Sequence, residues 1–490
     1  MSVVRRAPLR RVGLILVLLT GLPMALPARA ATAATAPTLR LFAAKDQVTV
    51  YQYGRRVVLD LGVWIAAQGG DFQLDVSRPD YDSSITATQV DSQTGDVLRT
   101  LPASAVSDFH GVNKFMHVTI RNRAGERVFN KMYTFCPNSF NRARVDDQGR
   151  VNSRYPFFCA FRFPFTKGSV WGIDDHWAVN PLSQGFRDPY ARIPAGRYTA
   201  VVRVNRAYTG LLGIPEDQAV VHLQVRVVST RPRPFGGGIG RAGLRPDTTV
   251  PARDANVPTV SEPDPDTLPD LVALPLWNAR VFTHRHRDVL AFAATEWNAG
   301  PAPLVVEGFR EPNTDVMDAF QYFFDAQGNP VGSTPAGSFE FDARRGHQHW
   351  HFEQLARYSL LNLAKTEVVR SHKQSFCIAP TDPVDLTAPR ANWQPWSLGL
   401  GSACGGPSAI WIREDLDTGW GDTYYQFVAG QAFNISAVPN GWYYLRSEVN
   451  PEGLLQERST TNDVEDRLVH LGGTPGHRTV LLAPWHGIRR

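Results

Sequence analysis

The sequence predicts an all-β protein of two tandem antiparallel β-sandwich domains joined by a Pro/Gly-rich linker. Short apolar or alternating runs bounded by turn residues recur along the chain, for example RRVVLDLGVWIAAQ and GWYYLRSEVN, and such runs are typical of sandwich strands. The chain has 490 residues, whereas a single core stops growing at roughly 250 to 300 residues. We therefore expect two cores.

Residues 1–30 have the pattern of a secretory signal peptide. Arginines precede the apolar run Val12–Leu19, and Ala28-Arg29-Ala30 offers small residues for cleavage. Because a membrane-spanning helix needs about 20 apolar residues, this run is too short to be an anchor. We expect a secreted, extracellular protein with no membrane attachment after cleavage, exported by either the general or the twin-arginine route.

The charge of the chain argues against a nucleic-acid partner. The formal net charge is +5, and residues 1–30 carry five arginines and no acidic residue. The mature chain is therefore close to neutral and lacks the basic surface that nucleic-acid binding requires.

The domain boundaries follow from a change in composition. Residues 229–267 are rich in Pro, Gly and Asp and have no apolar periodicity, which predicts a linker. The expected order is a first sandwich at 38–228, the linker, a second sandwich at 268–472 and a C-terminal tail at 473–490.

The two halves also resemble each other, which suggests an internal duplication. The run IPAGRYTAVVRVN in the first half parallels VPNGWYYLRSEVN in the second, and a Phe-Cys pair occupies a similar place in each. The alternative is that any two sandwiches share Pro-Gly turns and apolar strands.

Four cysteines in an exported chain predict two disulfides. Pairing within each half, Cys136 with Cys159 and Cys377 with Cys404, is the simplest of the three possible connectivities. Each bridge should stabilise the fold by about 3 to 4 kcal/mol on the chain-entropy model.

The most informative segment is GHQHWH, at residues 346–351. Successive side chains of a strand point to opposite faces, so His347, His349 and His351 would project from one face. Three imidazoles on one face can bind a transition metal, and imidazole suits Cu, Zn, Fe and Ni. The alternative is an exposed His-rich strand without a function.

This histidine segment is similar to the copper-binding signature of the lysyl oxidase family, and three further segments resemble that family in the same order. They are SHKQSFC around Lys373, Asp422-Thr423-Tyr424, and ERSTTND at 457–463. The resemblance covers residues 268–471 and leaves the first half outside it. Two departures are Arg357, where animal members have a histidine, and a longer loop containing Trp393 and Trp396.

The resemblance implies a secreted amine oxidase with copper(II) and a lysine tyrosylquinone cofactor made from Lys373 and Tyr424. Such an enzyme converts primary amines or the lysines of a protein substrate to aldehydes, and reduces dioxygen to hydrogen peroxide while ammonia is released. Amine oxidation needs an electron sink that no ordinary side chain provides. Asp422 is the nearest candidate for the catalytic base, although it could instead cap a turn. Tyr425 is the rival quinone precursor, but adjacent strand residues face opposite sides.

Two other functions remain open. One is a copper-binding extracellular module without turnover. The other is a zinc hydrolase that uses the same histidines with Glu353, which would share the face of His351. The first half is expected to be non-catalytic, since it retains only His117 of a possible trio, Lys131 in place of the cofactor lysine, and His176-Trp177 in place of the tyrosine.

Overall fold

The computed structural model describes residues 36–490 apart from 161–162, 183–189, 231–256, 311–313, 344–348, 372–374, 396–403, 408, 429, 486–487 and 489–490. The described part is almost entirely β, which confirms the predicted fold class. It contains one short α-helix, α1 (Arg206–Leu212), and three 3-10 turns, η1 (Ala103–Ala105), η2 (Glu216–Gln218) and η3 (Pro265–Thr267). Among these described residues no helix is long and apolar enough to cross a membrane.

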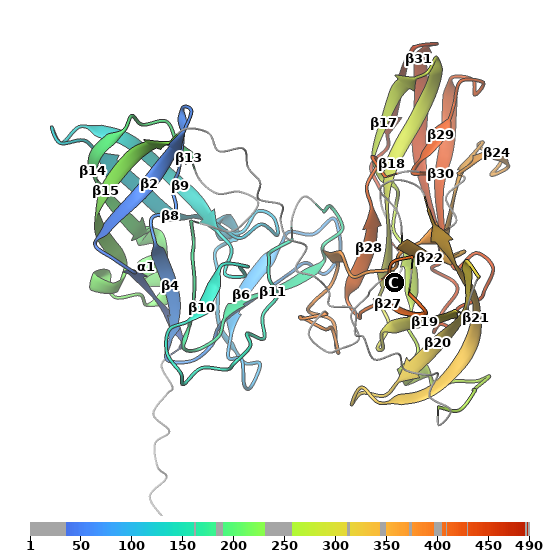
Figure 1. Cartoon of the computed structure of the whole chain (residues 1–490), viewed down its shortest axis with the longest axis horizontal. Coiled ribbons are helices and arrows are strands. Elements are labelled where there is room, and N and C mark those ends of the chain that lie inside the picture. Colours follow the sequence, from blue (N-terminus) through green and yellow to red (C-terminus); the bar gives the residue numbers. More distant parts are fainter. Residues whose placement is uncertain are drawn as a thin grey trace, which may run out of the picture. The chain divides into compact units, whose positions relative to one another are not determined.

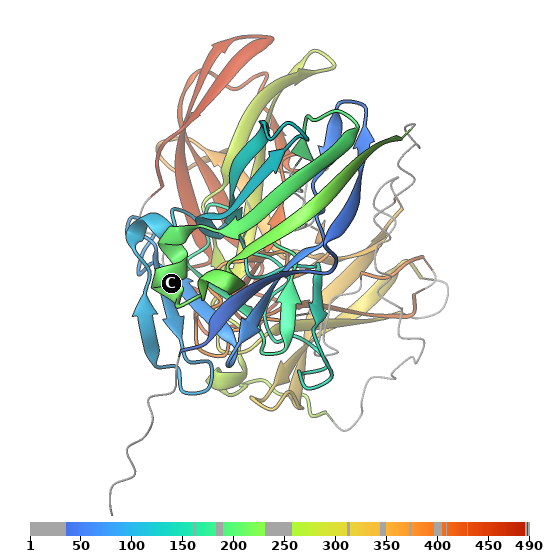
Figure 2. The same ribbon diagram turned by 90° about the vertical axis from the view of Figure 1, so that its left-hand side faces the viewer.

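The first half contains three sheets (Figure 1). Their strand orders are β1 (Thr38–Ala43), β4 (Val63–Gln68), β12 (Trp177–Val179), β10 (Arg142–Arg144); β11 (Gly168–Ile173), β5 (Phe72–Ser77), β6 (Thr86–Val90), β7 (Val97–Thr100); and β13 (Tyr190–Ala191), β3 (Arg56–Val58), β2 (Gln47–Tyr53), β15 (Val220–Thr230), β14 (Gly196–Val204), β8 (Val112–Arg121), β9 (Arg127–Phe135). Figure 2 shows the long green strands of the last sheet, which are β14 and β15, side by side.

The second half contains three corresponding sheets. Their orders are β16 (Leu271–Ala273), β18 (Arg287–Asn298), β28 (Trp420–Tyr424), β26 (Asp382–Pro383), with β17 (Trp277–His284) and β29 (Ala432–Asn434) also paired to β18; β25 (Ser375–Phe376), β22 (His349–Glu353), β21 (Pro330–Asp342), β20 (Val316–Phe324), β19 (Leu304–Arg310), β27 (Trp411–Leu416); and β24 (Glu367–Arg370), β23 (Ala356–Leu361), β30 (Gly441–Val449), β31 (Val464–Thr474), β32 (His477–Leu482).

The alternation of the sequence explains which faces these strands bury. In β14, for example, Tyr198, Ala200, Val202 and Val204 are buried and the residues between them are not. Side chains of a strand alternate between its two faces, so such a pattern places one face of the sheet on a core.

Strand order and register support the duplication. The order β9-β8-β14-β15 of the first half matches β24-β23-β30-β31 of the second. Tyr198 Oη donates to the carbonyl of Pro194 at 2.9 Å, and Tyr443 Oη donates to that of Pro439 at the same distance. A tyrosine bonded to the backbone upstream of it recurs in immunoglobulin-like sandwiches, so the matching strand order and register, more than this contact, favour a common origin of the halves.

The sheet of the second half extends beyond the expected domain boundary. The sequence places a tail at 473–490, but β32 lies within it and pairs antiparallel with β31. The sequence HRTVLL carries an alternating pattern of exposed and half-buried residues, which is how an edge strand packs one face. Residues 473–482 of the predicted tail therefore belong to the β31–β32 hairpin of the sheet.

Residues 36–490 form one compact unit in which the halves share hydrophobic clusters. Tyr155 and Val170 lie in a cluster otherwise made by the second half, and Phe163 and Phe165 pack with residues that include Trp277. Backbone and side-chain hydrogen bonds join the same regions: Lys167 N to Val384 O (2.6 Å), Leu386 N to Gly168 O (2.9 Å) and Thr166 Oγ1 to Pro383 O (3.1 Å).

Candidate functional site

Two of the three predicted metal-binding histidines lie side by side on β22. His351 is buried, His349 is half-buried, and their Nε2 atoms are 2.8 Å apart. Between them Trp350 points to the other face, where its Nε1 donates to the carbonyl of Gly406. His347 lies outside the described residues. The alternation expected for this strand thus brings two imidazoles together.

A carboxylate approaches the other nitrogen of the buried histidine. Asp342 Oδ2 on the neighbouring strand β21 lies 3.7 Å from His351 Nδ1. Metal-bound histidines commonly direct their second ring nitrogen towards a carboxylate or carbonyl, which sets the tautomer and the ring orientation. Asp342 is therefore placed to keep Nε2 of His351 directed at His349.

The histidine pair fits a metal ion. Imidazole nitrogens bind metals at about 2.0–2.1 Å, so two of them at right angles around one ion would be about 2.8–3.0 Å apart. The observed separation of 2.8 Å is close to this value, and it is also the length of a hydrogen bond between a protonated and an unprotonated imidazole nitrogen. The geometry is compatible with copper but does not by itself select it among imidazole-binding metals.

Tyr424 is held close to the same strand. It ends β28, its Oη donates to the carbonyl of Cys377 at 2.7 Å, and Phe376 packs edge-on against its ring at 5.0 Å. Phe376 in turn pairs with Phe352, the neighbour of His351 in β22. One short segment, 376–377, therefore connects the tyrosine with the histidine strand.

Buried carboxyl groups surround this tyrosine. Asp422 and Tyr424 share one face of β28, and Asp422 stands opposite Glu296 of β18 in the sheet register. Tyr358 Oη donates to Glu296 Oε1 at 2.8 Å. Burial, followed by the charges of Asp422 and Glu414, raises the pKa of the Tyr424 phenol well above its usual value. The site thus keeps this phenol protonated in the absence of a cation.

Asp422 is part of a strand rather than of a turn, so the alternative that it only caps a turn is wrong. It is 2% exposed, as buried as Glu296 and Glu414. The sequence reasoning named only Asp422 and missed the other two carboxyls. For Glu296 a signal was available, since it is the single acidic residue inside the apolar run VLAFAATEWN, and a buried strand admits a carboxyl only at some cost.

Lys373 belongs to residues 372–374, which lie outside the described part. The residues on either side are placed: Ser371 N donates to the carbonyl of Tyr358 at 2.9 Å, and Ser375 pairs with Glu353 in the β22–β25 ladder. The residue before this segment therefore lies beside Tyr358, and the residue after it lies beside the histidine strand.

Tyr425, the rival to Tyr424, points into a different cluster. Its ring packs edge-on against Trp277 at 5.6 Å, and burial raises its pKa to about 12. The opposite orientation of the two tyrosines agrees with strand alternation, and only Tyr424 packs against Phe376 of the segment 376–377.

Cys377, Cys404 and Glu414 also lie close together, with their ligand atoms within 4.8 Å of one another. Both sulfur atoms belong to the disulfide Cys377–Cys404. A metal-binding cysteine must be a thiolate, so this group is not a metal site. The first disulfide, Cys136–Cys159, likewise forms within its own half, as predicted.

The equivalent place in the first half is closed. Val112 pairs with Phe135 as Phe352 pairs with Phe376, so Gly111 takes the position of His351. A Cβ atom on this glycine, whose φ is 134°, would lie 2.4 Å from the carbonyl oxygen of Phe135. Phe109 precedes Gly111 by two residues, as His349 precedes His351, and therefore takes the position of His349.

The register corrects the comparison made from sequence. His117 lies opposite Arg203 as Arg357 lies opposite Glu448, so His117 corresponds to Arg357 and not to a member of the histidine trio. Lys131, opposite Val118, takes the place of Ser371. The sequence comparison, which does not include strand pairing, aligns this segment of the first half several residues away from its structural counterpart in the second half.

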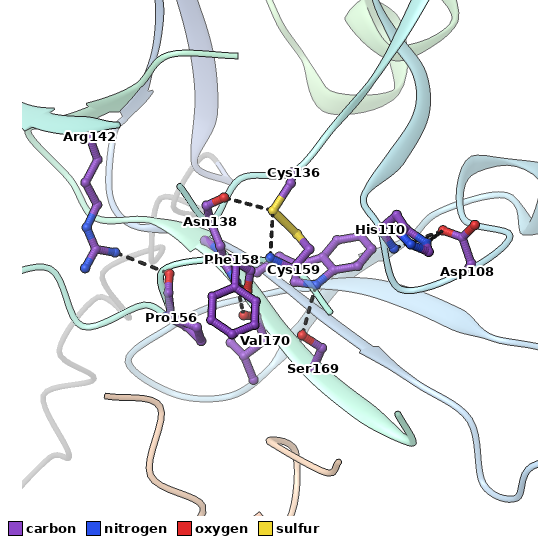
Figure 3. The surroundings of a disulfide bond; sticks show 12 residues. Asp108, His110, Cys136, Asn138, Arg142, Pro156, Phe158, Cys159, Ser169 and Val170 are labelled. Carbon is purple, nitrogen blue, oxygen red and sulfur yellow. Dashed lines mark hydrogen bonds and ion pairs between the residues drawn. A yellow bond between two sulfur atoms is a disulfide. The ribbon is translucent and has the colours of Figure 1, made fainter. Parts of the chain in front are cut away.

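Figure 3 shows what surrounds the first disulfide instead. Asn138 lies beside it and donates to the carbonyls of Phe158 and Val170, while its side-chain oxygen accepts from Gly172 N. His110 points away towards Asp108, at 2.9 Å. These contacts stabilise loops and offer no counterpart of the histidine pair among the residues drawn.

Replacing Gly111 by alanine should destabilise the protein by roughly 2–4 kcal/mol, because the new Cβ meets backbone atoms and the φ angle suits only glycine. Thermal unfolding would measure this. Gly210→Ala is the matched control: it lies in α1 with open space around its Cβ, and should raise stability by about 0.5–1 kcal/mol. Equal stability of Gly111→Ala and wild type would contradict the closed site.

A comparison with protein families places the second half. Residues 326–475 match the lysyl oxidase family model, described as "Lysyl oxidase". This region contains the histidine strand, Tyr424, Asp422 and Glu414 but not Glu296, and it is similar to the lysyl oxidase family.

Individual relatives agree with this assignment. Human protein-lysine 6-oxidase is 28% identical over 202 residues, which cover 40% of this chain and 44% of the relative. Human lysyl oxidase homolog 1 is 30% identical over 129 residues (26% and 20%), and lysyl oxidase homolog 2 of Bos taurus is 29% identical over 124 residues (24% and 13%). The chain thus spans less than half the length of these relatives.

Proposed function

We propose that the chain is a secreted, copper-dependent amine oxidase. It would oxidise primary amines, including the lysine side chains of proteins, to aldehydes, with dioxygen as the oxidant and hydrogen peroxide and ammonia as products. The printed name of the human relative, protein-lysine 6-oxidase, supports this substrate class. The observation that carries the proposal is the pair of imidazole nitrogens 2.8 Å apart, next to the segment that anchors Tyr424.

In this proposal, His347, His349 and His351 hold copper(II), and Lys373 and Tyr424 are the precursors of lysine tyrosylquinone. Copper would supply dioxygen chemistry during cofactor formation, and the quinone would supply the electron sink for amine oxidation. Asp342, whose Oδ2 lies 3.7 Å from His351 Nδ1, would orient the ring of His351 once the metal is bound. The carbonyl of Cys377 fixes the phenol of Tyr424.

Asp422 is the candidate base that takes a proton from the carbon next to the substrate nitrogen. It shares a strand face with Tyr424 and is buried beside Glu296. A carboxyl group away from water is a stronger base than one in solution, which suits proton abstraction near neutral pH. The same burial excludes water from the reacting groups.

The test is a variant of the buried histidine. His351→Ala should lose copper and should not react with phenylhydrazine, whereas wild type matured with copper should contain one copper and one hydrazine-reactive carbonyl per chain. His477→Ala, an exposed histidine of β32, is the control and should behave as wild type. Metal analysis and absorbance of the hydrazone measure both quantities.

The same experiment separates the alternatives. Copper without a hydrazine-reactive group in wild type would indicate a copper-binding module without turnover. Selective uptake of zinc together with hydrolytic activity would indicate a zinc hydrolase. Full copper occupancy in His351→Ala would show that the metal site lies elsewhere.

A further inference from the structure

A single peptide group links Tyr424 to a buried glutamate that the proposed chemistry does not use. The carbonyl of Cys377 accepts the hydrogen bond of Tyr424 Oη at 2.7 Å, and the N–H of the next residue, Ile378, donates to Glu414 Oε2 at 2.8 Å. In a trans peptide the C=O and N–H point in opposite directions. The phenol of Tyr424 and the carboxyl group of Glu414 therefore bind the same planar peptide group, one on its C=O side and the other on its N–H side.

This peptide lies between regular elements. Strand β25 ends at Phe376 and β26 begins at Asp382. Residues 377–381 belong to no strand, so the orientation of their peptide groups depends on individual hydrogen bonds. The disulfide at Cys377 restrains one end of the segment, and Glu414 restrains the amide that follows it.

Glu414 is itself fixed. It lies in β27 opposite Val306 of β19, and it is fully buried. Its second oxygen, Oε1, has no hydrogen-bond partner among the described residues. A buried carboxyl group with one unsatisfied oxygen lowers the stability of the fold. Such a group is expected where it has a functional role.

We propose that Glu414 is the positioning residue of the quinone precursor: it orients the Cys377–Ile378 peptide so that the Cys377 carbonyl holds the phenol of Tyr424. This inference deepens the function proposed above and rests on it for the role of Tyr424. Glu414 touches neither substrate nor cofactor in this role. Burial, followed by the charges of Asp422 and Asp415, raises the pKa of the Glu414 carboxyl well above its usual value.

Two substitutions test the role. Glu414→Gln keeps an oxygen that can accept from the Ile378 N–H and has nearly the same size as glutamate. Glu414→Ala removes the acceptor. In metal-free protein, hydrogen exchange measured by mass spectrometry should show the Ile378 amide exchanging about tenfold faster in Glu414→Ala and unchanged in Glu414→Gln.

After maturation with copper, Glu414→Ala should bind the metal as wild type does but form the hydrazine-reactive group several-fold more slowly, and Glu414→Gln should restore the wild-type rate. If the alanine variant does not fold, Glu414→Leu fills the volume without accepting a hydrogen bond and gives the same comparison. The exchange measurement needs no cofactor, so a wild type that never forms quinone defeats the proposed function but leaves the exchange result interpretable.

Two results would overturn the inference. Unchanged exchange at Ile378 in both Glu414→Ala and Glu414→Leu would show that Glu414 does not hold the peptide. A Glu414→Gln variant that forms quinone at the normal rate but has lost amine oxidation would show that Glu414 transfers a proton, and is thus a catalytic residue.

Discussion

Tyr424→Phe should retain copper and the fold but lack both the hydrazine-reactive group and amine-dependent peroxide release. Phenylalanine has no hydroxyl group from which a quinone can be made, so the loss should be complete. The fold should survive, because the variant gives up one hydrogen bond, Tyr424 Oη to Cys377 O, worth about 1–3 kcal/mol when a buried acceptor is left unpaired. Metal analysis, hydrazone absorbance and a peroxide assay measure the three properties.

Tyr425→Phe is the matched control. It removes the same hydroxyl from the neighbouring residue, whose ring packs on Trp277 in another cluster. This variant should form quinone and oxidise amines as wild type does. If Tyr425→Phe loses the quinone and Tyr424→Phe retains it, the cofactor is made from Tyr425 and the assignment to Tyr424 is wrong.

Lys373→Ala extends this test, because the proposed cofactor joins two residues. In wild type, digestion should yield the peptides of Lys373 and Tyr424 covalently linked, with no disulfide between them. In Lys373→Ala the two peptides should separate, even if Tyr424 is oxidised by itself. Two separate, unmodified peptides from an active wild-type enzyme would refute the quinone mechanism.

Removal of the first half should abolish both folding and activity of the second half. A chain that starts at residue 257 should not fold into an active enzyme, because its hydrophobic clusters lose Tyr155, Phe163, Phe165 and Val170. Truncating one buried aromatic residue to alanine costs about 3–5 kcal/mol, and a whole domain is stable by about 5–15 kcal/mol. Circular dichroism and copper uptake of the shortened chain, compared with the full chain, measure the result.

The matched comparison keeps the first half and disturbs only the interface. Phe165→Ala in the full chain should lower the stability by about 3–5 kcal/mol without removing the copper ligands. If the chain from residue 257 folds, binds copper and forms quinone as the full chain does, the halves are independent and the first half has another role.

The sequence by itself predicted the class of fold, favoured the pairing of cysteines within each half that the structure contains, and predicted that His349 and His351 share one face of a strand. These depend on local rules. Alternating apolar residues specify a strand and its buried face, and the same two-residue period places His349 and His351 on one side of β22. The order of the four motifs was enough to identify the lysyl oxidase resemblance that the family comparison supports.

Only the tertiary structure decided which distant strands lie together. Glu296 and Glu414 are more than 100 residues apart in the chain, yet both influence the pKa of Tyr424. No local pattern encodes such a neighbourhood, because it depends on the pairing register of β18 with β28 and of β19 with β27. For the same reason His117 matched the histidine trio in sequence but corresponds to Arg357 in space: a shift in register moves a side chain to another environment while the apolar pattern stays acceptable.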